Sequence, residues 1–166
     1  LYWTGSYERT IEMGHISRAL ASDVRSAEAL LRGGGLEALG LAGLGRHEEA
    51  LAIWSDLIEL AGQIGRSPAV LLNYSALAFR ELYDVEEARR RSEEALELSL
   101  ANTFGMPTQF ARSDLLYTQL LDGDIGGAQA TWPRLWEGAE EATAWTTWLI
   151  AGRLANARAE IAVVAE

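Results

Sequence analysis

The sequence has no cysteine and no lysine, and only three of its 166 residues are proline. Without cysteine, disulfide bonds and thiolate metal sites are excluded, although the redox compartment stays open. No apolar run approaches the roughly 18 residues that a membrane-spanning helix needs. The first residues lack a start methionine and the basic and apolar regions of a signal peptide. We therefore expect a cytoplasmic location and a piece of a longer protein.

Basic residues are scarce in comparison with acidic ones. The chain carries 24 aspartates and glutamates against 14 arginines, which gives a net charge of −10. A nucleic-acid surface and an anionic membrane both require clustered basic residues. We therefore expect neither nucleic acid nor a membrane as a partner. Because 49% of the residues are hydrophobic, the chain can bury a core, and we expect one domain over residues 1–166.

Four segments resemble one another at a nearly constant spacing along the chain. They begin at Gly5, Gly45, Tyr83 and Gly123. Each has a small residue five positions later, namely Thr10, Ala50, Ala88 and Ala128, with spacings of 40, 38 and 40 residues. Trp54 and Trp132 both follow that small residue by four positions. Such regularity predicts repeated structural units of about 40 residues.

Each unit has the pattern of two helices. Apolar residues recur at intervals of three and four positions, which is typical of an amphipathic helix. No alternating run rich in β-branched residues indicates a strand. The predicted helices are 7–21, 24–44, 47–63, 67–82, 84–102, 107–122, 125–140 and 142–164. They form units of roughly 1–22, 23–64, 65–104 and 105–141, followed by a partial unit 142–166.

At these residues the chain resembles the tetratricopeptide repeat (TPR) family, whose pattern is W-x2-L-G-x2-Y, then A-x3-F, then P, over about 34 residues. The third unit carries the first part of the pattern at Leu72, Ser75, Ala76 and Phe79. The second part is carried by Ala50 with Trp54, Ala88 with Ser92 and Ala128 with Trp132. The chain departs from the family in three ways. The closing proline is absent, the units are longer, and Gly34 and Glu37 stand where large apolar residues are expected.

The resemblance implies an all-α fold, a right-handed α-solenoid of about four TPR-like antiparallel helix pairs. Units of this length are similar to the helical-repeat regions of large bacterial signalling proteins, including ATP-dependent transcription regulators and multidomain nucleotide cyclases. The function implied is that of a protein- or peptide-binding scaffold without enzymatic activity. The alternative is a regulatory domain that senses a small molecule in the same groove.

In TPR-like stacks the first helix of each pair lines the concave groove where partners bind. Reading one face of these helices gives candidate partner-binding residues at Tyr2, Trp3, Leu39, Asn73, Leu77, Arg80, Glu81, Ser113, Asp114, Tyr117 and Leu121. Among them, Arg80 is suited to bind a carboxylate through two N–H groups.

Other motifs do not indicate chemistry. Residues 33–38 fit G-x-G-x-x-A, and Gly35 and Gly40 have the spacing of a phosphate-binding loop. Helical residues precede this stretch and no Gly-Lys-Ser/Thr follows, so the glycine run predicts a softened or kinked helix. Neither His15 nor His47 has a second metal-ligating residue at the spacing of a metal site, so we expect both histidines to lie on the surface. The cluster Arg89–Arg90–Arg91 is flanked by Glu86, Glu87, Glu93 and Glu94, which pair with it at four-residue spacing, as on a solvated helix face. We expect no catalytic residue, metal or cofactor.

The predicted last helix has apolar residues on more than one face, including Trp145, Trp148 and Ile161. A terminal repeat normally has a polar outer face because nothing stacks on it. We therefore expect a homodimer through the terminal helix, as a consequence of truncation.

Overall fold

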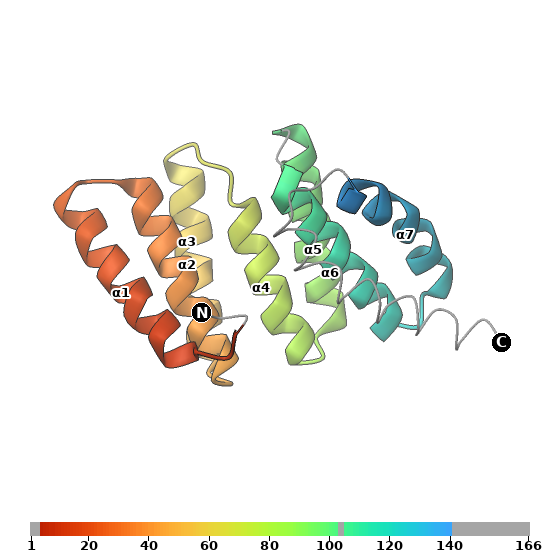
Figure 1. Ribbon diagram of the computed structural model, residues 1–166, viewed down its shortest axis with the longest axis horizontal. Helices are drawn as coiled ribbons and strands as arrows, with labels where there is room; N and C mark the ends of the chain where they lie inside the picture. Colours follow the sequence, from red (N-terminus) through yellow and green to blue (C-terminus); the bar gives the residue numbers. More distant parts are fainter. Residues whose placement is uncertain (1–3, 103–104, 141–166) are drawn as a thin grey trace. The chain divides into compact units, whose positions relative to one another are not determined.

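The computed structural model describes residues 4–102 and 105–140, and over these ranges it is built from α-helices without a strand (Figure 1). The all-α prediction is confirmed for this part of the chain. The helices are α1 (Tyr7–Asp23), α2 (Ala27–Gly43), α3 (His47–Gln63), α4 (Ala69–Glu81), α5 (Val85–Ala101), α6 (Gly105–Leu121) and α7 (Ile125–Glu140). The predicted helix 142–164, and with it the expected dimer contact, lies outside the described residues.

The helix boundaries follow the predicted ones closely. The predicted bounds 47–63 and 125–140 are those of α3 and α7. The largest difference is at α2, which begins at Ala27 rather than at residue 24. Two neighbours explain this late start: Arg25 has a left-handed φ of 52°, and the Ser26 hydroxyl accepts a hydrogen bond from the Ala29 N–H at 3.3 Å.

The turns between helices repeat one backbone conformation. Residues with positive φ occur at Gly5 (75°), Gly45 (76°), Tyr83 (59°) and Gly123 (74°), the positions at which the sequence segments begin. At Gly45 the N–H donates to the Ala42 carbonyl, and the next N–H, of Arg46, donates to the Leu41 carbonyl, both at 2.9 Å. The same two bonds recur at Tyr83 and at Gly123. These are Schellman turns, in which a left-handed residue ends the helix and satisfies its last carbonyls.

By its internal contacts the chain divides into two compact units, Leu1–Ala78 and Phe79–Glu166, and the division falls within α4. In the first unit α2 packs against both α1 and α3. Its core contains Ala38, Trp54, Leu57, Ala61 and Leu71, so α4 also contributes to it. The expectation of a single domain over residues 1–166 stays a prediction.

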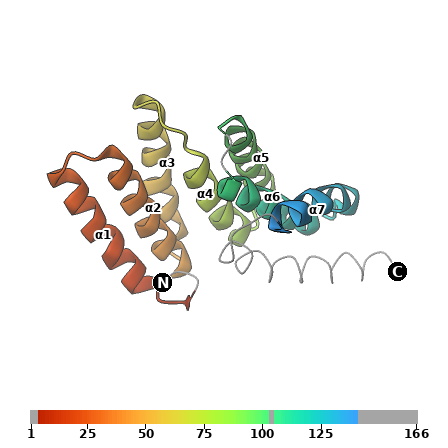
Figure 2. The same ribbon diagram turned by 45° about the horizontal axis from the view of Figure 1, so that its top comes forward.

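In the first unit α2 lies between α1 and α3 (Figure 2). Three consecutive glycines of α2 face neighbouring helices. A Cβ on Gly33 would lie 2.9 Å from the backbone nitrogen of Arg18 in α1. One on Gly34 would lie 2.7 Å from a methyl of Leu57 in α3, and one on Gly35 would lie 3.1 Å from a methyl of Leu71 in α4. The glycine run is thus neither a phosphate loop nor a helix end. It lets three helices approach α2 from three sides.

In the second unit α6 packs against both α5 and α7. Leu116, Ala128 and Leu135 are fully buried between α6 and α7, and Trp132 packs against them while half-buried. At the other end of the unit, the Arg91 guanidinium lies over the Phe79 ring, 5.7 Å from its centre. Among the described helices of both units, none is long and apolar enough to cross a membrane.

Candidate functional site

The structure divides the predicted groove residues into buried and accessible ones. Leu39, Asn73, Leu77, Ser113 and Asp114 are buried, with at most 5% of their surface exposed. Burial counts against direct contact with a partner, and the prediction for these five positions stays untested. For Leu39 the reason for burial lies in α2, whose neighbours on three sides leave only a narrow strip of the helix facing solvent. Tyr2 and Trp3 lie outside the described residues.

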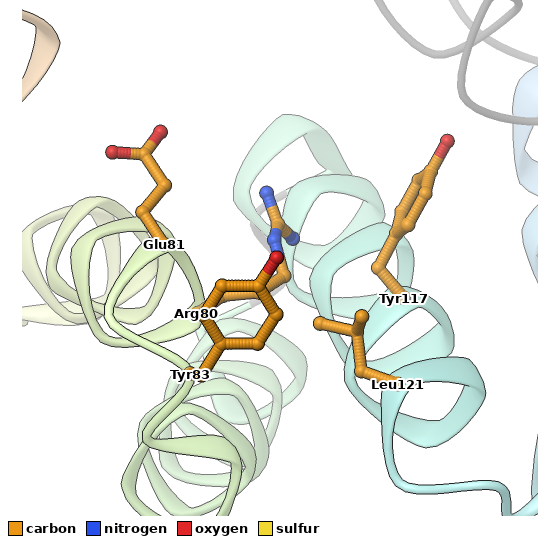
Figure 3. Close-up of a pocket in the computed structure, with 5 residues that line it drawn as sticks. All are labelled: Arg80, Glu81, Tyr83, Tyr117 and Leu121. Atoms are coloured by element: carbon orange, nitrogen blue, oxygen red, sulfur yellow. The ribbon is translucent and has the colours of Figure 1, made fainter.

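The remaining predicted residues gather in one pocket within the second unit (Figure 3). It has a volume of about 410 Å³ and is lined by Arg80, Glu81, Tyr83, Tyr117 and Leu121. Arg80 and Glu81 end α4, Tyr83 lies in the turn that follows, and Tyr117 and Leu121 belong to the last turns of α6. The pocket therefore lies where the carboxyl-terminal ends of α4 and α6 meet the α4–α5 turn.

Arg80, which lines this pocket, is held in place by a buried acidic partner. Its Nη1 donates to Asp114 Oδ1 at 2.9 Å, and the Asp114 side chain is only 2% exposed. The guanidinium also lies over the Tyr117 ring, 5.3 Å from its centre, which is the geometry of a cation–π contact. The carboxylate that Arg80 binds is thus the chain's own Asp114, and the arginine side chain, 17% exposed, forms a wall of the pocket.

The groups that face solvent at this pocket are aromatic, aliphatic and acidic. Tyr83 is 79% exposed and Leu121 is 47% exposed, and the Glu81 side chain is exposed beside them. Figure 3 shows the side chains of Arg80, Glu81 and Tyr117 extending to the same side of the two helices. Because most of its lining is exposed, the pocket is an open depression rather than a closed cavity.

The charges in and around this pocket are of both signs, with Arg80 and Glu81 in its lining. The carboxyl-terminal ends of helices carry partial negative charge, and two of them meet at the pocket. The chain as a whole has a net charge of −10. Asp84 and Asp122 directly follow the lining residues Tyr83 and Leu121, and they are held by the Glu87 N–H and by Arg89 respectively.

Tyr83 was missing from the residues predicted for the groove. The sequence does hold a signal for it: Tyr83 begins the third repeated segment, whereas the other three segments begin with glycine. Glycine adopts positive φ without steric cost, whereas a tyrosine there is strained. The sequence pattern identified a turn at this position but did not show that the turn residue would reach the pocket.

The remaining sequence motifs have structural roles. His15 Nε2 lies 2.7 Å from Glu37 Oε1, and Arg18 Nη1 donates to Glu37 Oε2 at 2.5 Å. These two contacts explain how α2 buries a glutamate where the repeat pattern expects an apolar residue. His47 begins α3.

The arginine cluster forms ion pairs on the surface of the second unit. Arg90 and Arg91 both donate to Glu87, and Arg90 also reaches Glu94, as on the predicted solvated helix face. Arg89 instead donates to Asp122 at the end of α6. Hydrogen bonds from Arg90, and then from Arg91, lower the pKa of Glu87 to about 2. The cluster is therefore neutralised by the chain's own carboxylates.

Comparison of the chain with family models, with curated proteins and with solved structures finds no match.

Proposed function

We propose that the chain is a TPR-like helical repeat, a right-handed solenoid of about four antiparallel helix pairs. Two kinds of repetition support this. The left-handed residues that begin the four segments recur at intervals of 40, 38 and 40, and Arg25 and Gly65 have the same conformation 20 residues after Gly5 and Gly45, so the first two units each contain two turns of one kind. The small residues of the pattern, Ala50, Ala88 and Ala128, are each 0% exposed, as expected where two helices cross closely.

The proposed function is to bind a peptide or a protein segment, as a scaffold module of a bacterial signalling or transcription regulator. The observation that carries it is the open pocket at the ends of α4 and α6, which are first helices of their pairs in the repeat scheme. Tyrosine and arginine are enriched among the residues that supply most of the binding energy of an interface, and the pocket presents both.

An open depression favours a peptide over the alternative, a small-molecule sensor. Sites for small ligands bury most of the ligand surface in a largely enclosed cavity. Tyr83 and Leu121 expose too much of their surface to enclose a ligand in this way. A peptide, in contrast, can place one side chain in the depression and continue along the surface.

The test is a screen of immobilised short peptides that differ systematically at one central position. Saturable binding is expected for a subset of sequences. Leu121→Ala should weaken it by roughly tenfold, the size expected for an anchor contact. The matched control is Leu20→Ala, which removes from α1 a leucine that is also exposed (59%, against 47% for Leu121).

Binding that is lost in Leu121→Ala and kept in Leu20→Ala supports the proposal. If no peptide binds saturably, or if both variants weaken binding equally, the peptide-binding function is wrong. Circular dichroism of both variants shows whether either has lost helix.

A further inference from the structure

We propose that α1 carries a self-association surface, and that its occupant is α1 of a second copy of this chain, packed antiparallel about a two-fold axis near Ile16. The surface is a row of apolar side chains with 42% to 70% of their area exposed, which we call the outer stripe. It consists of Met13, Ile16 and Leu20 of α1 and of Val24, which caps the helix. The inference concerns the first unit and goes beyond the peptide site proposed for the second.

The two sides of α1 are the reverse of those of an ordinary surface helix. Figure 1 shows α1 at the edge of the first unit with α2 beside it. The buried residues of α1 are small, namely Thr10, Gly14 and Ala21. In α3, by contrast, the buried residues include Trp54 and Leu57. Because a helix normally turns its large apolar side chains toward the core, a row of them on the solvent side of α1 indicates a surface that another molecule covers.

The outer stripe is continuous and ends in charged residues. Its four members lie three, four and four positions apart, which places them in one row along the helix. Arg9 lies on the same row, four positions before Met13. Asp23 lies beside the other end of the row, three positions after Leu20. Both charged side chains are exposed, and neither belongs to an ion pair within the part of the chain that the structure describes.

These two charges are arranged symmetrically about the centre of the outer stripe. Arg9 and Asp23 each lie seven residues from Ile16, in opposite directions. Seven residues are about two helical turns, or roughly 10 Å along the axis. A two-fold axis at Ile16 therefore brings Arg9 of each copy opposite Asp23 of the other, so that the pair forms twice. Parallel packing of the two helices would instead place like charges together. Charge complementarity thus favours a second copy as the occupant and an antiparallel direction.

The length of the helix sets the strength of the contact. α1 has 17 residues and is about 25 Å long. One pair of such helices buries less area than the standard interface of about 800 Å² on each partner, so the dimer belongs to the weak, reversible class. We expect a dissociation constant of roughly 10 µM.

Sedimentation equilibrium at micromolar concentrations tests the proposal on the full chain. The parent should be a mixture of monomer and dimer. Ile16→Glu places a carboxylate from each copy at the two-fold axis and should weaken the dimer by at least about 100-fold. The matched control is Leu100→Glu, the same kind of change at a leucine of α5 that is 52% exposed, and it should leave the dimer unchanged. Thermal melting followed by circular dichroism shows whether either variant has lost its fold.

Exchanging the two charges tests the direction of the helices. Arg9→Asp and Asp23→Arg should each weaken the dimer by roughly tenfold, because each places like charges opposite one another. The double variant Arg9→Asp, Asp23→Arg should regain the parent's affinity, since the pairs form again with their signs reversed. This recovery is specific to antiparallel packing, and a misfolded variant would not show it.

The outcomes separate this surface from other occupants. A chain that stays monomeric up to roughly 100 µM would overturn the proposal. A dimer that persists in Ile16→Glu is formed by another face, such as the terminal helix expected from the sequence, and would overturn it as well. A double variant as weak as the single ones would refute the antiparallel pairing. None of these results bears on the peptide site, which the peptide screen tests separately.

Discussion

Replacing Gly14 by alanine tests the tight packing of α1 on α2. A Cβ at Gly14 would lie 2.7 Å from the Glu37 backbone nitrogen and 2.8 Å from the Gly33 carbonyl oxygen. Ordinary contacts are about 3.5–4.0 Å, so α1 would have to move away by about 1 Å. Overpacking of this kind costs about 1–3 kcal/mol, and alanine recovers at most about 1 kcal/mol through its helix propensity. We expect a net loss of about 1–2 kcal/mol for Gly14→Ala.

Gly62→Ala is the matched control, since it makes the same chemical change in α3 with nothing within 4 Å of the new methyl group. It should be neutral or stabilising by up to about 1 kcal/mol. Urea unfolding followed by far-ultraviolet circular dichroism measures both variants. In a chain of this length, each kcal/mol corresponds to about 2–4 °C in melting temperature. If Gly14→Ala is as stable as Gly62→Ala, α1 and α2 do not pack through this glycine, and the close helix contact is wrong.

Three further perturbations have outcomes that the structure defines. Trp54→Ala should lower the free energy of unfolding by about 3–5 kcal/mol, because the ring is 1% exposed in the core. Urea unfolding measures this change, and a loss below about 1 kcal/mol would contradict the packing of Trp54. Arg80→Ala should cost about 3 kcal/mol by leaving the buried Asp114 charge without its arginine, and the Arg80→Ala, Asp114→Ala double variant should recover part of that loss in the same assay. Because the pKa of Glu87 is lowered from 4.5 to about 2, its contribution to stability is complete above pH 4.5 and is lost as the pH falls toward 2. The stability of Glu87→Gln should therefore depend less on pH in that interval, and an NMR titration giving Glu87 a pKa near 4.5 would refute the ion pairs.

The helices were predictable because their signals are local. Apolar spacing and turn residues determined α3 and α7 to the residue. The start of α2 was placed too early because the left-handed Arg25 gives no signal in the sequence, whereas glycine at the equivalent turns does. The run of three glycines was recognised as helical, but its role depends on which neighbour each glycine faces, and that is a property of the tertiary structure.

The candidate site was predictable only in part. Periodicity put Arg80, Tyr117 and Asp114 on one predicted surface, and the structure has Arg80 and Tyr117 lining one pocket. Periodicity could not show that Asp114 is buried in an ion pair with Arg80. A helical pattern identifies which residues share a face but not how many neighbours cover it. Tyr83 was missed because it lies in a turn, outside the helical pattern on which the prediction was based.

The central claim is that a partner peptide occupies the pocket at the ends of α4 and α6, and NMR titration tests it most directly. The isotopically labelled chain is titrated with a peptide that binds saturably in the immobilised screen, and backbone amide shifts are followed. The account predicts saturable shifts concentrated at residues 80–85 and 117–124, with the amides of α1 and α3 unchanged. Shifts distributed over other helices, or no shifts at a peptide concentration that saturates binding in the screen, would contradict it.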